Sequence, residues 1–234
     1  AYSHVRVVGI NAINVESDDE LIDVQVTTGD DEIILATRNG MAIRFHESDV
    51  RNMGRTATGV RGVRLREDDL VVGMVVIRRD TAAQATLLVV SERGRGKRTA
   101  IDEYRFQSRG GSGVINFRVS EPTGHVVAIK EVFPGDELMM ITRNGVIIRQ
   151  RVNEIRVIGR ATQGVRLLSL DQGDVLVDVA RLVPEDESGE PAIGNGAPPD
   201  GTGMDLPEGE SDTDLSVEEP MGDPLSDEDA EAQP

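Results

Sequence analysis

Short runs of apolar and β-branched residues, separated by turn residues, recur along the first 183 positions. The runs at 32–37 and 41–45 flank Asn39-Gly40, and the runs at 138–142 and 146–148 flank Asn144-Gly145. Two such runs joined by Asn-Gly are the typical sequence of a β-hairpin. A second pair of strand-like runs follows each hairpin region, at 60–65 with 71–77, 114–119 with 126–132, and 165–170 with 175–182. No amphipathic helix pattern interrupts them, so the sequence predicts an all-β fold.

The same landmarks return about every fifty residues. Gly40, Gly94 and Gly145 are each followed by arginine at +4, +11 and +15 and by a second glycine at +19. The second glycines are 54 and 51 residues apart, and Gly9, 50 residues before the first of them, marks a truncated copy. The repeats cover approximately 1–30, 31–80, 84–134 and 136–183. Four strands in about fifty residues are typical of a propeller blade, so we expect about 3.5 four-stranded blades.

The charges divide the chain into two parts. Residues 184–234 hold 17 of the 42 acidic residues, eight of the ten prolines and none of the 25 bases, whereas acids and bases balance over 1–183. The C-terminal part has too few apolar residues to offset its ordering entropy, which predicts a folded body at 1–183 and a disordered acidic tail at 184–234. The chain has no cysteine, which excludes disulfides and thiolate metal sites. No run approaches the roughly 18 apolar residues of a membrane span.

Nine arginines of the body occupy three registers of the repeat. These are Arg44, Arg98 and Arg149; Arg51, Arg105 and Arg156; and Arg55, Arg109 and Arg160. A guanidinium group stays charged and binds phosphate through a planar pair of donors. Equivalent positions of a blade lie on equivalent parts of its rim, so the registers predict one curved cationic array for sequence-tolerant binding of duplex DNA. In the alternative, these arginines pair with acids inside the blades, as in a propeller-type protein-interaction module.

One glycine-rich loop falls between strands of the middle repeat. It contains Gln107, Arg109, Gly110, Gly111 and Gly113. Glycines let a backbone approach a phosphate closely, and the arginine adds charge, so the loop is a second candidate for DNA contact.

The sequence offers no catalytic machinery. Tyr104 is predicted to be a packing residue, because Val50 and Ile155 fill its slot in the other repeats. The three histidines share no register, so no metal set is expected. The acidic pairs at 18–19, 30–31 and 68–69 are predicted to be solvated turn residues.

Four stretches resemble the C-terminal domain of the bacterial DNA gyrase A protein. They are residues 30–45, 48–65, 96–119 and 139–170. The resemblance implies a six-bladed β-pinwheel whose blades exchange strands, with DNA wrapped around a basic perimeter and an acidic tail after the last blade. The signature box of this family, Gln-Arg-Arg-Gly-Gly-Lys-Gly, lies in its first blade, and loop 107–113 differs from it by Ser108 and Ser112. The loop is therefore expected to belong to a later blade, the fifth.

The resemblance also implies the partners. We expect a non-catalytic, DNA-wrapping piece of an ATP-dependent type IIA topoisomerase, in the bacterial cytoplasm with the nucleoid and away from membranes. The breakage-reunion domain with its catalytic tyrosine, and the first blades, are expected to lie outside this chain, which begins at Ala1. Partners would be duplex DNA, the gyrase B protein and a second copy of gyrase A. No cofactor is expected in this chain; Mg²⁺ and ATP would serve the holoenzyme. The C-terminal domain of the topoisomerase IV A protein is the close alternative, and the long acidic tail favours gyrase.

Overall fold

The computed structural model describes residues 12–184, and the predicted acidic tail lies outside them apart from its first residue. This part of the chain contains β-strands and three short 3-10 helices but no α-helix, which confirms the all-β prediction. The strands are β1 (Glu32–Thr37), β2 (Met41–His46), β3 (Val71–Ile77), β4 (Thr86–Ser91), β5 (Arg95–Ala100), β6 (Val114–Ile115), β7 (Val126–Val132), β8 (Glu137–Thr142), β9 (Ile147–Arg151), β10 (Val165–Arg166) and β11 (Leu176–Leu182). The 3-10 helices η1 (Glu47–Asp49), η2 (Ile101–Glu103) and η3 (Val152–Glu154) follow β2, β5 and β9. The helices of residues 12–184 are single 3-10 turns, and none of them could span a lipid bilayer.

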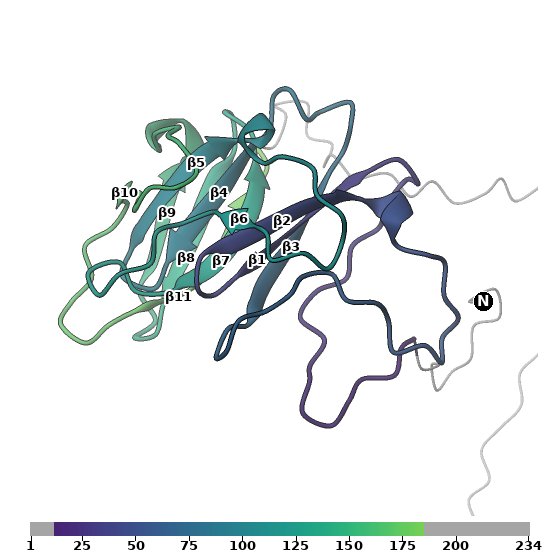
Figure 1. Ribbon diagram of the computed structural model, residues 1–234. Coiled ribbons are helices and arrows are strands. Elements are labelled where there is room, and N and C mark those ends of the chain that lie inside the picture. Colours follow the sequence, from purple (N-terminus) through teal and green to yellow (C-terminus); the bar gives the residue numbers. More distant parts are fainter. Residues whose placement is uncertain (1–11, 185–234) are drawn as a thin grey trace, which may run out of the picture. The chain divides into compact units, whose positions relative to one another are not determined.

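The strands form three antiparallel sheets, one for each complete repeat (Figure 1). Their orders are β3-β1-β2-β6, β7-β4-β5-β10 and β11-β8-β9. The central hairpin of each sheet has the same register, because Ile34 pairs with Arg44, Leu88 with Arg98 and Met139 with Arg149. The sequence repeat is therefore a structural repeat of blades.

Two blades receive their fourth strand from the following repeat. Strand β6 pairs with β2, and β10 pairs with β5. The predicted pairing of 114–119 with 126–132, and of 165–170 with 175–182, is therefore wrong, since each first segment joins the preceding sheet for two residues only. The predicted strand at 60–65 is coil. This exchange of strands is what the resemblance to a pinwheel implies.

The hydrophobic core fills the spaces between the sheets. Leu87 and Val89 of β4 pack towards the first sheet, whereas Leu88 and Val90 pack towards the third. All four are fully buried, because the middle sheet is covered on both faces. Strand β7 also contacts both β3 and β11. The edges formed by β3 and β11 thus both meet β7, and β6, β10 and β9 form the opposite, outer edges.

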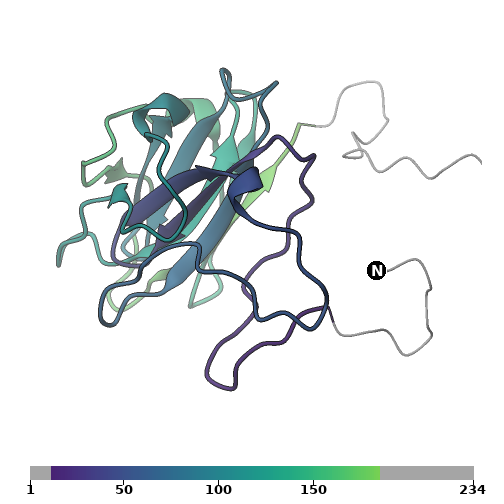
Figure 2. The same ribbon diagram turned by 45° about the vertical axis from the view of Figure 1, so that its right-hand side comes forward.

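The first described segment does not join a sheet. Residues 12–30 run as an extended trace beside the loop that follows η1 (Figure 2). Asn14 links the two, since its backbone amide donates to the Ala57 carbonyl (3.4 Å) and its side chain to the Thr56 carbonyl (2.8 Å). The truncated first repeat therefore contributes no strand within the described residues.

Two carboxylates that were predicted to be solvated are buried. Asp31 is 2% exposed and Asp69 is 5% exposed. The Asp69 carboxylate accepts hydrogen bonds from the backbone amides of Asn39 (2.9 Å) and Leu70 (3.0 Å). The Asp31 carboxylate accepts one from Thr28 (2.7 Å). Each closes a turn at the end of a sheet, and this local bonding offsets the cost of burial.

Candidate nucleic-acid interface

Two segments cover the outer edges of the first two sheets. We call residues 104–117 and 155–168 the exchanged segments. The first follows β2, since the Gln107 amide donates to the Arg44 carbonyl (2.9 Å) and the Asn116 amide to the Gly40 carbonyl (2.8 Å). The second follows β5 in the same way, with Ile158 bonded to Arg98 (2.9 Å) and Leu167 to Gly94 (2.9 Å). Figure 1 shows β6 beside β2 at this edge. Side chains that are exposed on the exchanged segments therefore lie on the outer edge of the molecule.

The first arginine register begins with a buried scaffold residue. Arg44 is 9% exposed and pairs with Glu32, and its guanidinium also donates to the carbonyls of Ile101 (2.8 Å) and Tyr104 (2.9 Å). The ring of Phe106, 4.2 Å away, covers one more side of the guanidinium. Arg44 therefore ties its own blade to the start of the next one.

The other members of this register differ from Arg44. Arg98 is 7% exposed and donates to the Ile155 carbonyl (2.8 Å), and burial lowers its pKa. Arg149 is exposed and pairs with Glu137, which occupies the slot of Glu32. The prediction of one array of nine exposed arginines is therefore wrong for Arg44 and Arg98, because these two lie beneath the exchanged segments.

The second register is fully displayed. Arg51, Arg105 and Arg156 are all exposed, and their side chains form no hydrogen bond or ion pair within residues 12–184. Arg105 and Arg156 lie on the exchanged segments, each directly after a buried anchor residue, Tyr104 or Ile155. They occupy equivalent positions on neighbouring outer edges. Of the three registers, this one best matches the predicted cationic rim.

The third register links successive segments of the rim. Arg109 donates to the carbonyls of Arg61 (2.5 Å) and Asp49 (3.1 Å). Arg160 donates to the carbonyl of Ile115 (2.6 Å), which occupies the repeat slot of Arg61. Both side chains remain partly exposed, and Arg55 is exposed. Arg109 and Arg160 thus fix the spacing between neighbouring segments while leaving part of their charge at the surface.

The glycine-rich loop packs against the first blade. The Gly110 amide donates to the Gly62 carbonyl (2.7 Å), and the Gly111 carbonyl accepts from Arg64 (2.8 Å). Gly113 has a φ of 72°, and a Cβ there would lie 2.4 Å from the Ala42 oxygen. The close approach that requires a glycine at Gly113 is therefore to a neighbouring strand. Arg109 is the cationic residue of this loop.

Tyr104 is a packing residue, as predicted. Its side chain is fully buried, and its hydroxyl donates to the Asn116 side-chain oxygen (2.5 Å). Burial raises the pKa of this phenol. A buried, hydrogen-bonded and protonated phenol has no access to a scissile phosphate, so it cannot act as a nucleophile in this position.

Lys97 is a buried cation beneath the second exchanged segment. It was not singled out from the sequence. Its side chain is fully buried in β5, between the second blade and the second exchanged segment. The available signal was a lysine in the slot that Ile43 and Ile148 occupy in the other repeats.

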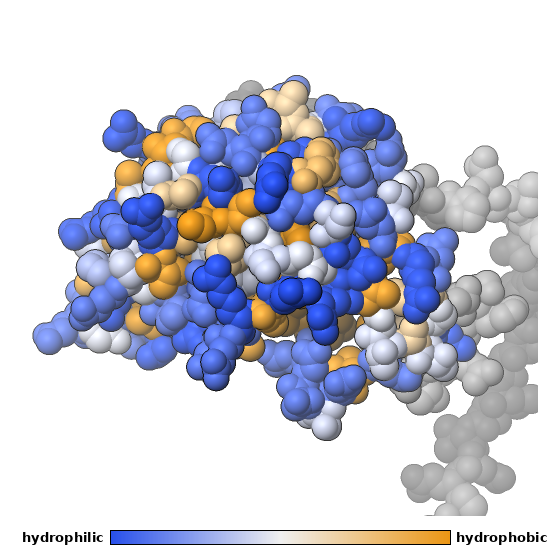
Figure 3. All heavy atoms as spheres, in the orientation of Figure 1, coloured by the Kyte–Doolittle hydropathy of each residue, from blue (hydrophilic) through white to orange (hydrophobic). Residues whose placement is uncertain are grey.

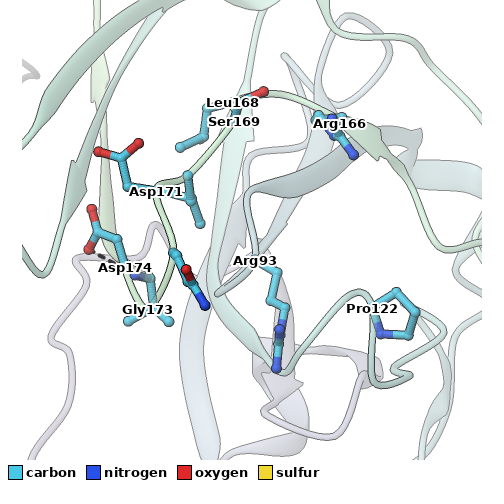
Figure 4. A pocket seen from close by; sticks show the side chains of 11 residues that line it. Arg93, Pro122, Arg166, Leu168, Ser169, Asp171, Gly173 and Asp174 are labelled. Carbon is cyan, nitrogen blue, oxygen red and sulfur yellow. Dashed lines mark hydrogen bonds between the residues drawn. The ribbon is translucent and has the colours of Figure 1, made fainter.

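A cleft of ≈ 580 Å³ opens between the β4–β5 turn and the loop after β10. Arg93 and Arg166 line it together with Asp171 and Asp174 (Figure 4). The Asp174 carboxylate is occupied, since it accepts from the backbone amides of Asn144 (3.2 Å) and Val175 (2.8 Å). The cleft thus has mixed charge, and its arginines add to the cations near the outer edge. Hydrophilic side chains cover much of the face seen in Figure 3, with small apolar areas between them.

The fold defines the class of protein. Three stacked antiparallel sheets with strands exchanged between consecutive repeats are a bladed β-propeller variant of the pinwheel kind. The family model described as "DNA gyrase C-terminal domain, beta-propeller" matches residues 6–28, 31–78, 85–132 and 136–182. The chain belongs to this family.

Known relatives agree with this assignment. The DNA gyrase A protein of Haloquadratum walsbyi is 44% identical over 190 residues, which are 81% of this chain and 22% of that protein. The solved structure "Structure of DNA gyrase A C-terminal domain" superposes with a TM-score of 0.68 at 27% identity, over 75% of this chain and 59% of that one. "Crystal structure of the C-terminal domain of DNA topoisomerase IV" gives 0.71 at 27% identity, over 77% and 55%. The chain spans about a fifth of the length of the curated relatives it matches.

Proposed function

We propose that this domain binds duplex DNA along its outer edge, without base-specific readout, and wraps it as part of a gyrase. The observation that carries the proposal is the display of Arg105 and Arg156 at equivalent positions of the two exchanged segments. Exposed guanidinium groups without a carboxylate partner are suited to phosphate. Because the two arginines recur from blade to blade, they would suit the regularly spaced phosphates of a duplex. Contacts to phosphates carry no sequence information.

The division of the arginines supports this proposal and refines it. Arg51, Arg105 and Arg156 would contact phosphates directly. Arg55, Arg109 and Arg160 would contribute their exposed sides, and Arg149 stands exposed on the third blade. Arg44 and Arg98 would hold the blades together.

In the whole enzyme this domain would serve DNA supercoiling with the gyrase B protein and a second copy of gyrase A. Catalysis, Mg²⁺ and ATP would belong to other parts of that assembly. A gyrase is favoured over topoisomerase IV because the family match and the curated relatives are gyrase A proteins. The C-terminal domain of a topoisomerase IV A protein is the alternative, since the topoisomerase IV structure superposes about as well as the gyrase A structure.

Charge reversal tests the proposal. The double variant Arg105→Glu, Arg156→Glu is expected to weaken binding to a 40-base-pair duplex by about 100-fold or more at low salt, since it replaces two phosphate contacts by repulsion. The control is Arg66→Glu, Arg79→Glu, which changes the net charge equally at exposed positions outside the exchanged segments and also breaks the exposed ion pair of Arg79 with Asp30. Two duplexes of unrelated sequence should give the same result. Equal losses in both double variants would contradict the proposal.

A second candidate function is a protein-interaction module. The burial of Arg44 and Arg98 favours it, since a role in holding the blades together would by itself explain those two positions. It predicts that Arg105→Glu, Arg156→Glu leaves the DNA affinity of the chain unchanged, so the same titration separates the two functions.

A further inference from the structure

The interface between the second and third blades contains a buried ammonium group. Lys97 lies in β5 and is fully buried. It is one of two lysines in the chain. In the first blade the equivalent Ile43 is also fully buried and lies against Gly111 of the first exchanged segment. The two interfaces therefore have the same backbone frame but different chemistry at this point.

The ammonium group binds the backbone of the second exchanged segment. It donates to the Gly159 carbonyl (2.9 Å), to the Arg160 carbonyl, and to the Thr99 hydroxyl (3.2 Å). The Thr99 hydroxyl in turn donates to the Ile158 carbonyl (3.0 Å). Three consecutive carbonyls of one turn are thus held from the second blade. The same turn connects Arg156 to Arg160, two members of the proposed DNA-binding rim.

No carboxylate forms an ion pair with Lys97 within residues 12–184. The charged groups that face it are Glu103, which favours its charged form, and Arg160, which opposes it. Burial is the larger effect and lowers the pKa of Lys97 to about 8. The neighbouring Arg98 is also buried and forms no ion pair in the part of the chain that the structure describes, because Thr86 occupies the slot that Glu32 fills in the first blade. The interface therefore holds two buried cations with little opposing charge.

We propose that Lys97 is a positioning residue of the DNA-binding rim, which holds the 158–160 turn so that Arg156 and Arg160 face the duplex, and that a DNA phosphate at this turn supplies its opposing charge. The inference rests on the proposed function. Negative charge brought to the turn stabilises the charged lysine and, by linkage, charging the lysine strengthens the binding of DNA. The second interface, rather than the first, would then make binding sensitive to pH.

The first experiment uses the full chain without DNA. Lys97→Met keeps an apolar stem of similar length and removes only the ammonium group, and Lys130→Met in β7 is the matched control for the same loss of charge. Amide hydrogen exchange over 158–162 is expected to be about tenfold faster in Lys97→Met than in the wild type, because the carbonyls of Gly159 and Arg160 lose a fixed donor. Exchange over 107–111, in the Ile43 interface, should stay unchanged. Unchanged exchange over 158–162 would overturn the positioning role.

The second experiment adds a duplex. At pH 7, Lys97→Met is expected to bind about three- to tenfold more weakly than the wild type and to lose less than about one unit of salt slope, because the buried charge acts on a nearby phosphate without contacting it. As the pH rises from 7 to 9.5, the DNA affinity of the wild type should fall towards that of Lys97→Met. At pH 9.5 the two affinities should differ little. Lys130→Met should follow the wild type throughout. Wild-type affinity and pH profile in Lys97→Met would overturn the inference.

The two experiments separate the possible failures. If the wild-type chain binds no DNA, the proposed function fails and the DNA role of Lys97 fails with it, while hydrogen exchange still reports whether Lys97 holds the turn. If the wild type binds DNA but Lys97→Met changes neither exchange nor affinity, only the inference about Lys97 is overturned. Thr99→Val provides an independent variant, which should act in the same direction with a smaller effect.

Discussion

The two interfaces between blades have one backbone design and two kinds of side-chain chemistry. In both, a segment of the following repeat bonds to the arginine and the glycine of the preceding hairpin, at Arg44 and Gly40 or at Arg98 and Gly94. In the first interface the arginine is paired with Glu32, whereas in the second Arg98 has no such partner among residues 12–184 and Lys97 adds another cation. Backbone bonding therefore defines the strand exchange, and the side chains are free to set the electrostatics of each interface separately.

The largest expected effect concerns the buried ion pair. Arg44→Met should lower the free energy of unfolding by about 3 kcal/mol, because it leaves the largely buried Glu32 carboxylate without its partner. Arg98→Met should cost only about 1–2 kcal/mol, since it leaves one carbonyl without a donor and no carboxylate unpaired. Urea denaturation of both variants measures the difference. Equal losses would mean that the pairing with Glu32 contributes nothing to the contrast.

The glycines of the hairpin turns give the next largest effect. Gly40 and Gly145 have nearly the same φ, 82° and 83°, but a Cβ on Gly40 would lie 2.1 Å from the Phe117 oxygen, whereas none of the described atoms lies within 4 Å of one on Gly145. Gly145→Ala should cost about 1–2 kcal/mol from its left-handed conformation alone. Gly40→Ala should cost about 1–3 kcal/mol more, because the exchanged segment must move. Gly94→Ala, with 2.8 Å to the Leu168 oxygen, should fall between them. A different order would contradict the role assigned to the exchanged segments.

A smaller effect concerns the second interface, whose contribution to the free energy of unfolding should depend on pH. The pKa of Lys97 is lowered to about 8 in the folded chain from its usual value of 10.5, so the unfolded chain binds more protons between these values. The stability of the wild type relative to Lys97→Met should therefore rise as pH increases through 8, by about 2 kcal/mol at pH 9.5. Urea denaturation at pH 7 and 9.5 measures it. Ile43→Met in the first interface should show no such change with pH, and a flat difference for Lys97→Met would contradict the charge assigned to the second interface.

Most of the strands could be predicted from the sequence. The runs at 32–37, 71–77 and 126–132 match β1, β3 and β7 residue for residue, because their neighbours in the sheet come from their own repeat and turn chemistry marks their ends. The outer strands could not be predicted to the same extent. Their partners lie in another repeat, so local patterning overestimates them, as at 114–119, and no strand of residues 12–184 pairs with 60–65.

The sequence predicted which arginines are candidates for the site, but not which of them are exposed. The registers identified the arginines, yet spacing alone does not show whether the following repeat covers them, which is why Arg44 and Arg98 were assigned to the rim. A signal was available for Arg44, since an acid stands twelve residues before it and before Arg149, at Glu32 and Glu137. Two strands of one hairpin bring such a pair together.

The salt dependence of DNA binding tests the central claim most directly. The measured quantity is the slope of the logarithm of the association constant against the logarithm of the salt concentration. It should be about −3 if only the second register contacts phosphates, and about −6 if the exposed members of the other registers also do. Arg105→Glu, Arg156→Glu should reduce the magnitude of that slope by about 2 units, while Arg66→Glu, Arg79→Glu leaves it unchanged. A wild-type slope near zero, or one that the rim variant does not alter, would contradict a cationic outer edge that binds duplex DNA.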